Sequence, residues 1–191
     1  MEETPALMKH IEDHLGPILA GWTTDPDGNK QPFQIVICNS PVAGAKVLLT
    51  LGLSSKPLWT EAQGLRRQEM LMMFRETDKP RSLPVVLQEL ALQAWSRDQA
   101  FALGDVIGPR GPIVEGGTVS AFFVAPPAYL PESFAFVRGI GPVRATVLFG
   151  WLVPIAETEA AFVRANGAEA FEDELMSSSP DLLDFRRASI V

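Results

Sequence analysis

Cysteine and histidine are scarce in this sequence. Its 191 residues include one cysteine, Cys38, and two histidines, His10 and His14. A single cysteine excludes an internal disulfide framework and a cysteine-based structural zinc site. The histidines share one face of a predicted helix, but Ile11 stands where zinc proteases carry their catalytic glutamate, and no third histidine follows. We therefore expect no metal and no cofactor, and we expect Cys38, at the end of an apolar run, to be structural.

Basic residues and long apolar runs are also in deficit. Sixteen Lys and Arg against 23 Asp and Glu give a net charge of −7, whereas a nucleic-acid binder needs a basic face. The longest stretch without a charged residue, 116–131, contains three prolines and is shorter than the about 20 residues of a membrane-spanning helix. The N-terminus is acidic and lacks the order of a signal peptide. We expect a cytoplasmic protein that binds neither nucleic acid nor membranes.

The length and composition predict one domain over residues 1–191. Hydrophobic residues make up 47% of the chain and charged residues 20%, which excludes disorder as the main state. A chain of this length buries about 70% of its unfolded surface, so it needs no disulfide or metal to hold its core. The run Ser177–Pro180 predicts a loop and makes residues 177–191 a candidate flexible segment.

Hydrophobic periodicity predicts an α+β fold, in which a mixed β-sheet of about six or seven strands packs against two or three helices. The clearest strands cover residues 33–38, 47–53, 68–74, 119–124, 134–138 and 143–153. Helices are predicted from Thr4 to Gly16, over residues 82–101 with Ser82 as N-cap and Gly104 as stop, over 157–166, and as a short turn through Phe171 and Leu175. These elements do not alternate as βαβ units, which argues against a doubly wound fold.

Glycine-rich segments give no nucleotide-binding motif. The run Gly139–Arg144 begins like a dinucleotide fingerprint, but Arg144 replaces the third glycine and a strand follows instead of a helix. The run Gly108–Pro112 lacks the Lys-Ser/Thr ending of a P-loop. The turn-rich region 108–141 does contain Arg110, Glu115 and Arg138. An alternative interpretation therefore makes the protein a small-molecule-binding protein or a hydrolase with its site in this region.

Two aromatic residues and an acidic segment are candidates for contact with a partner. Trp59 and Tyr129 follow prolines in predicted loops, where they would anchor a partner or cover the core. Residues 156–191 contain eight acidic and three basic residues. Within them, Glu157 and Glu159 begin a predicted helix and favour its dipole. This acidic surface would steer a basic partner, or it is simply a solvated face.

Five segments, in order along most of the chain, form a further pattern. They are Leu49–Ser54, Glu69–Met73, the helix from Leu87 to Trp95 with Gly104 after it, Leu152–Ile155 running into Glu157–Glu159, and an acidic helix before Leu183–Ser189. This pattern of hydrophobic and turn residues resembles the Suppressor of fused domain family, in the short single-domain form found in bacteria.

The resemblance implies binding rather than catalysis. Animal members of the family clamp an extended peptide between two domains, where it pairs with sheet edges, and the short bacterial members have been proposed as immunity proteins. We therefore expect a non-enzymatic protein-interaction domain whose partner is a protein or an extended peptide. An immunity role against a basic toxin is a finer hypothesis. The residues that we expect to contact the partner are Trp59, Tyr129, Glu157, Glu159, Arg186 and Arg187.

Overall fold

A computed structural model describes residues 3–25, 27–61, 64–78, 82–140 and 145–191. These residues form one sheet of nine strands, four α-helices and two 3₁₀ turns. The strands are β1 (Ala20–Thr24), β2 (Lys30–Asn39), β3 (Ala45–Leu51), β4 (Leu58–Thr60), β5 (Gly64–Arg75), β6 (Val106–Ile107), β7 (Val119–Ala125), β8 (Phe136–Ile140) and β9 (Ala145–Ala156). The helices are α1 (Glu3–Leu15), α2 (Leu83–Arg97), α3 (Glu157–Asn166) and α4 (Ala168–Ser178), and the 3₁₀ turns are η1 (Leu53–Ser55) and η2 (Glu132–Phe134).

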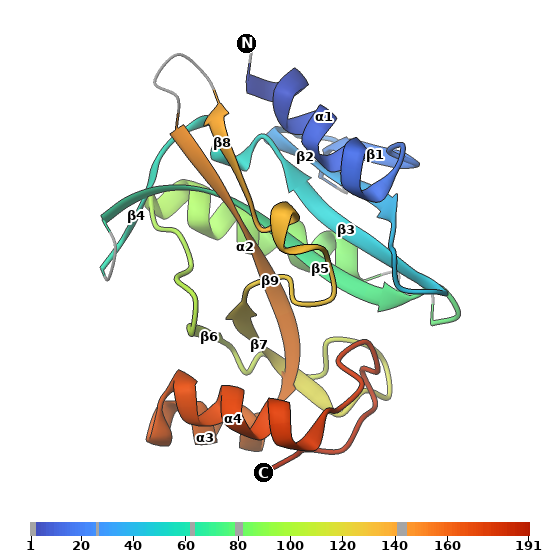
Figure 1. The fold of residues 1–191 in the computed structure, drawn as a ribbon, viewed down its shortest axis with the longest axis vertical. Helices are drawn as coiled ribbons and strands as arrows, with labels where there is room; N and C mark the ends of the chain where they lie inside the picture. Colours follow the sequence, from blue (N-terminus) through green and yellow to red (C-terminus); the bar gives the residue numbers. More distant parts are fainter. Residues whose placement is uncertain (1–2, 26, 62–63, 79–81, 141–144) are drawn as a thin grey trace.

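The two long strands β5 and β9 form the centre of the sheet (Figure 1). They run parallel, with Arg67 opposite Val147 and Leu71 opposite Trp151, while the other strand pairs of the described residues are antiparallel. The strand order is β1-β2-β3-β5-β9-β7-β6, with β4 on β5 and β8 on β9. This mixed sheet with its helices confirms the predicted α+β class.

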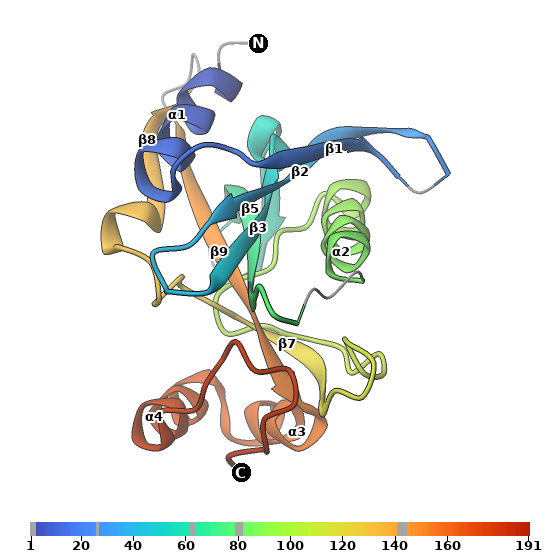
Figure 2. The same ribbon diagram turned by 90° about the vertical axis from the view of Figure 1, so that its right-hand side faces the viewer.

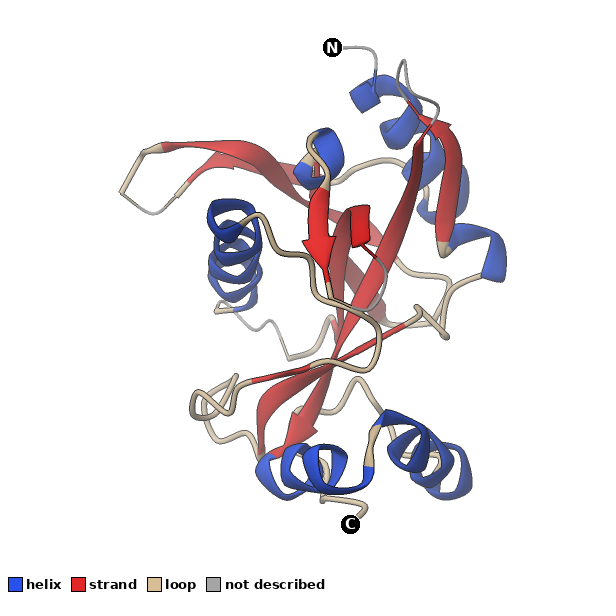
Figure 3. Ribbon diagram, turned by 90° about the vertical axis from the view of Figure 1, so that its left-hand side faces the viewer, coloured by secondary structure: helices blue, strands red, loops and turns tan. Residues whose placement is uncertain are grey.

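Helices cover both faces of the sheet (Figure 2). Leu7 and Ile11 of α1 are buried in one core cluster with the side chains of one sheet face. Leu87 and Leu90 of α2 are buried in a second cluster with the opposite face. The pair α3–α4 packs beside the ends of β7 and β9, far from α1 (Figure 3), and Phe171 joins the first cluster.

The strand count exceeds the prediction because three short strands carry no hydrophobic alternation. All five residues of β1 are exposed, β4 has three residues and β6 has two. These strands are defined by their pairing with β2, β5 and β7, which the local sequence does not encode. The six strands that periodicity predicted are all present, with bounds shifted by a few residues.

Helix α2 is shorter than predicted, and it ends at Arg97 rather than at Phe101. Asp98 adopts a left-handed conformation (φ 56°), and the ammonium group of Lys56 binds both the Trp95 carbonyl and the Asp98 carboxylate. Ser82 occupies the predicted N-cap position, but its hydroxyl donates to the carbonyl of Ile113 and makes no capping hydrogen bond. Gly104 does not end the helix and instead donates its N–H to Val124.

The other helices agree better with the sequence. Helix α1 matches the predicted bounds within one residue, and α3 matches them fully. The predicted short turn through Phe171 is a complete eleven-residue helix, α4. Residues 141–144, which contain part of the dinucleotide-like run and the first residues of a predicted strand, lie outside the described residues.

The last part of the chain packs onto the body of the protein. Leu183 and Phe185 are each 1% exposed, and Thr118 donates its N–H to the carbonyl of Phe185. Ser177 and Ser178 complete α4, and the chain turns at Ser179, which has φ 45°. Flexibility of residues 177–191 stays a prediction.

Candidate functional site

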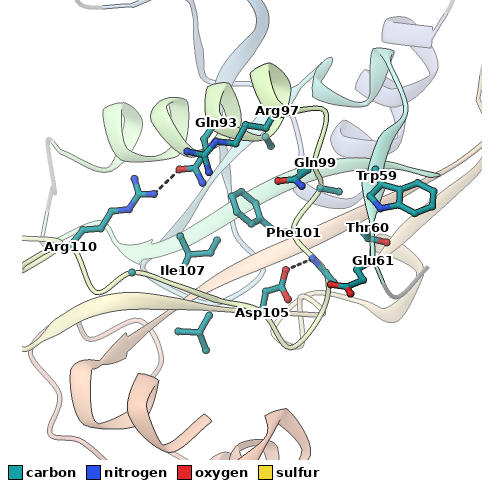
Figure 4. A pocket seen from close by; sticks show the side chains of 15 residues that line it. Trp59, Thr60, Glu61, Gln93, Arg97, Gln99, Phe101, Asp105, Ile107 and Arg110 are labelled. Carbon is teal, nitrogen blue, oxygen red and sulfur yellow. Dashed lines mark hydrogen bonds between the residues drawn. The ribbon is translucent and has the colours of Figure 1, made fainter. Parts of the chain in front are cut away.

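A cleft of 910 Å³ opens between the end of α2, β4 and the segment 99–110, which includes β6 (Figure 4). We call it the α2–β6 cleft. Gln93 and Arg97 line it from α2, Trp59 and Glu61 from the region of β4, and Phe101 lies between these walls. Segments that are distant in sequence meet here, so the cleft exists only in the folded chain.

Backbone hydrogen bonds fix one wall of the cleft. The N–H of Trp59 donates to the carbonyl of Asp98 (2.7 Å), and the N–H of Ala100 donates to the carbonyl of Trp59 (2.8 Å). The chain after α2 thus runs along the outer side of β4 as an added strand-like segment. Because both of its backbone groups are bound, Trp59 is held in place while its side chain remains 53% exposed.

The amide of Gln68 holds the next part of the wall. Its Nε2 donates to the carbonyl of Phe101 (2.8 Å), and its Oε1 accepts from the N–H of Phe101 (3.1 Å). Gln68 is buried on β5, and it pairs with Phe101 as a neighbouring strand would. Gly150 on β9 makes room for this contact, because a Cβ there would lie 3.0 Å from Nε2 of Gln68.

Asp105 forms the turn that leads into β6. Its carboxylate accepts the N–H of Ala102 (2.7 Å), and its carbonyl accepts the N–H of Val124 (2.9 Å). This carboxylate therefore has a structural role. Beyond it, β6 pairs with β7 alone among the described strands and ends the sheet on this side.

The charges of the cleft lie on two walls. Arg97 lies on α2, and Arg110 donates to the side-chain oxygen of Gln93 (2.6 Å), whereas Asp105 and Glu61 lie on the opposite side (Figure 4). No nucleophile and base lie within hydrogen-bond distance of each other here, among the residues described. The arrangement suits the recognition of a polar, extended ligand.

The histidines and the cysteine have structural surroundings. Nε2 of His10 contacts the carbonyl of Phe134 (3.2 Å), and His14 contacts the His10 carbonyl and the Ser133 hydroxyl. Burial lowers the pKa of His10. Over the described ranges, no group of three or more His, Cys, Asp or Glu side chains is placed to hold a metal ion. Cys38 is fully buried, and burial raises the pKa of its thiol to about 12.

The two aromatic residues predicted to contact a partner have different surroundings. Trp59 is exposed and lines the α2–β6 cleft. Tyr129 is half-buried, with its ring 5.0 Å from that of Trp151 between centroids and its hydroxyl donating to the carbonyl of Pro180 (3.4 Å). Tyr129 thus covers the core around the buried Trp151, which was one of the two uses that its sequence context allowed.

The four predicted contact residues near the C-terminus lie away from the cleft. Glu157 and Arg186 are exposed, and Arg186 reaches the carbonyl of Glu115 (3.3 Å) and the carboxylate of Asp78 (3.8 Å). Glu159 is 0% exposed and Arg187 is 7% exposed, and the two bind each other. Neither of these two side chains belongs to the surface.

The α2–β6 cleft does not bring together the three charged residues of the alternative site in the turn-rich region. Arg110 lines the α2–β6 cleft, but Glu115 and Arg138 do not. Glu115 is exposed, and Arg138 lies on β8 with its guanidinium 4.9 Å from the ring centroid of Phe136.

Sequence reasoning missed a buried polar site at Glu69. One of its carboxylate oxygens accepts the N–H groups of Gly52 (2.9 Å) and Ser54 (3.0 Å) and the hydroxyl of Ser54 (2.7 Å), and the other accepts the hydroxyl of Thr50 (2.5 Å). Gly52 has φ +102°, a conformation that side chains disfavour. Burial raises the pKa of Glu69, although these hydrogen bonds oppose the shift.

A carboxylate inside the apolar run Gln68–Phe74 was the available signal for this site. The contacts of Glu69 join two of the segments that carry the family resemblance, Leu49–Ser54 and Glu69–Met73. One set of hydrogen bonds therefore joins these two segments. Strand β5 supplies the carboxylate that accepts them, and the end of β3 with the turn after it supplies the donors.

Comparison with known proteins identifies the fold. A family model described as Suppressor of fused protein (SUFU) matches residues 29–188. A SUFU homolog from Neisseria gonorrhoeae superimposes with a TM-score of 0.72 and 22% identity, over 100% of this chain and 98% of that chain. No curated protein matches the sequence. Among the described residues, none of the helices has the length and apolar character needed to cross a membrane.

Two further solved structures share the fold. A chain of the Sufu–Fu complex superimposes with a TM-score of 0.73 and 16% identity, over 99% of this chain and 92% of that chain. Drosophila Suppressor of fused gives a TM-score of 0.73 and 16% identity, over 99% of this chain and 51% of that chain. The present chain therefore spans about half the length of the Drosophila protein.

Proposed function

This chain belongs to the Suppressor of fused family, and from that premise we propose that it is a non-enzymatic protein-interaction domain that binds an extended segment of a partner protein in the α2–β6 cleft. The proposal is supported by the Sufu–Fu complex, in which a protein of this fold is found with another protein. It is also supported by the make-up of the cleft, whose described residues offer groups for recognition and none arranged for turnover.

The observation that carries the proposal is the exposed indole of Trp59. A tryptophan that is 53% exposed leaves a large apolar area in water, and such side chains often dominate the binding energy of protein interfaces. The hydrogen bonds of its backbone to Asp98 and Ala100 fix the backbone of Trp59 at the mouth of the cleft before a partner arrives. A backbone segment that is already ordered loses little further backbone entropy on binding.

The sheet edge at β6 supports an extended ligand. An extended peptide that pairs with an exposed edge gains main-chain hydrogen bonds, while neighbouring pockets select its side chains. In the cleft that faces this edge, Ile107 and Phe101 offer apolar contacts, and Arg97 of α2 and Arg110 offer charged ones. The partner segment would lie between α2 and β6, with an apolar residue against Trp59.

The finer proposal is that this domain is an immunity protein that neutralises a partner toxin. The fold occurs in a protein from the bacterium Neisseria gonorrhoeae. Exposed carboxylates of α3 and α4, from Glu157, Glu169, Glu172 and Asp173, would attract a basic toxin and speed the encounter. In this arrangement the acidic face steers the partner and the cleft binds it.

The test is a binding titration with purified protein and the purified product of an adjacent gene. We expect Trp59→Ala to weaken binding about thirtyfold or more, as at an interface hot spot, and Trp22→Ala, an exposed tryptophan on β1, to leave it within about twofold. Equal affinity of Trp59→Ala and wild type would overturn the site.

The immunity role has a separate test. Co-expression of this protein with the toxin should restore growth, and growth arrest that persists would exclude the immunity role.

A further inference from the structure

The sheet has four edge strands in the described part of the chain, and they differ in how well they are guarded. Strand β4 is covered by the segment after α2, which binds the backbone of Trp59. Strand β6 ends the sheet on one side, β1 ends it on the other, and β8 lies on the outer side of β9. Exposed edge strands tend to pair with other chains, and proteins normally protect them by short length, charge, proline or a bulge. Strand β6 has two residues, and β8 has Arg138 at its centre.

Strand β1 has no charged residue and no proline, and its protection is limited to a register shift in its pairing with β2, between Trp22 and Thr24. Its sequence is Ala-Gly-Trp-Thr-Thr, and all five residues are exposed. Leu19, directly before it, is 49% exposed and Trp22 is 44% exposed. This uncharged strand therefore presents apolar side chains and a row of backbone groups to solvent, in a protein whose net charge is −7.

The edge is also held in an extended form. Strands β1 and β2 make a hairpin that projects from the body past α2 (Figures 2 and 3), with Trp22 opposite Ile35 and Thr24 opposite Lys30. At its tip, Asp25 and Asn29 exchange hydrogen bonds: Asp25 donates its N–H to the Asn29 carbonyl (2.9 Å), and the Asn29 N–H donates to the Asp25 carboxylate (2.7 Å). A projecting hairpin can pair without a clash between the bodies of two molecules.

We propose that β1 pairs antiparallel with β1 of a second copy of this chain, about a two-fold axis at Trp22. Such pairing places Trp22 opposite Trp22, Gly21 opposite Thr23 and Ala20 opposite Thr24, so that no charged residues face each other. The charge pattern favours this copy-to-copy pairing at β1 over β8, because the same symmetry at β8 would place Arg138 opposite Arg138. Each copy uses the same surface, as a two-fold interface requires.

The proposed dimer is weak and independent of the cleft. Two five-residue strands bury less than the about 1,200 Å² of a standard interface, so association appears only at high protein concentration. Because β1 and the cleft share no residues, failure of this proposal would leave the proposed function intact, and the reverse also holds.

The test is sedimentation of the purified full chain over a range of concentrations. Wild type should show a dimer fraction that rises with concentration. Trp22→Lys and Trp22→Glu each place like charges at the two-fold axis, and each should weaken the dimer about tenfold or more. An equimolar mixture of the two variants should restore it, because Lys then faces Glu. Trp59→Lys, the matched change at another exposed tryptophan, should dimerise as wild type does.

The rescue separates pairing at β1 from damage to the fold, since a misfolded variant would not regain a dimer on mixing. Wild type that stays monomeric at all concentrations would overturn the proposal, as would an undiminished dimer of Trp22→Lys. Loss of the dimer in both variants without rescue in the mixture would overturn the two-fold register at Trp22.

Discussion

Arg187 and Glu159 form a two-point ion pair inside the protein. Nη1 of Arg187 lies 2.6 Å from Oε1 of Glu159, and Nη2 lies 2.8 Å from Oε2. The same carboxylate accepts the N–H groups of Ala156 (2.7 Å) and Ile190 (3.0 Å). This pair ties the end of the chain to the start of α3, and each further hydrogen bond offsets part of the desolvation of two buried charges.

Removal of one partner of this pair should be strongly destabilising. Arg187→Met leaves the Glu159 carboxylate buried without its cation, and we expect the free energy of unfolding to fall by about 3–5 kcal/mol. Urea denaturation measures the change. The control is Arg186→Met, at the exposed neighbouring arginine, which should change the free energy of unfolding by about 0.5 kcal/mol or less. Equal effects of the two variants would contradict the structural role of the buried pair.

Because of Glu69, the free energy of unfolding should decrease as the pH rises. A carboxylate that is paired with a cation has the opposite effect. Burial raises the pKa of Glu69 above the ordinary value of 4.5, so the folded protein binds a proton at Glu69 more readily than the unfolded chain does. The stabilisation from this group is therefore complete below pH 4.5 and is lost as the pH rises through the raised pKa.

The comparison with Glu69→Gln isolates this effect, because glutamine cannot ionise. We expect the free energy of unfolding of wild type, relative to that of Glu69→Gln, to decrease as the pH rises from 4.5, the ordinary glutamate pKa, toward neutrality. Urea denaturation of both proteins at a series of pH values measures the difference. A difference that stays constant with pH, or that grows in favour of wild type, would mean that burial does not raise the pKa.

Loss of the Gln68 amide should loosen the wall of the α2–β6 cleft. Gln68→Met keeps the size of the side chain but leaves the N–H and the carbonyl of Phe101 without their partner, at about 1–3 kcal/mol for each buried group. We expect faster hydrogen exchange at Phe101 and weaker binding of the partner. The matched control for hydrogen exchange is Gln99→Met, at an exposed glutamine in the same cleft. If exchange at Phe101 is no faster in Gln68→Met than in wild type, the amide is not what holds this segment.

Periodicity predicted the long elements well and missed the strands β1, β4 and β6. Strand β5 could be predicted because Met70 to Phe74 form an apolar run, and α3 because Glu157 and Glu159 begin it with favourable charges. Strand β4, in contrast, owes its form to pairing with β5 and with the segment after Asp98. Such partners lie many positions away in sequence and leave no local pattern.

The candidate site was predictable only in part, for the same reason. Trp59 was recognised as a contact candidate and Arg110 as a charged residue of a turn-rich region. The cleft that contains both depends on the early end of α2, which Lys56 stabilises from 39 positions upstream of Trp95. Gln68, which holds Phe101, lies in an apolar run that predicts a strand but gives no indication of a side-chain contact.

The parallel pairing of β5 with β9 joins two parts of the sheet that must come together during folding. The earlier part, β1 to β5, and the later part, β6 to β9, are each joined internally by antiparallel neighbours, whereas Arg67 meets Val147 only 80 positions later. Closing so long a loop has an entropic cost that nearby contacts do not offset. We therefore expect the two parts to collapse separately and the meeting of β5 with β9 to limit the rate at which the native protein forms.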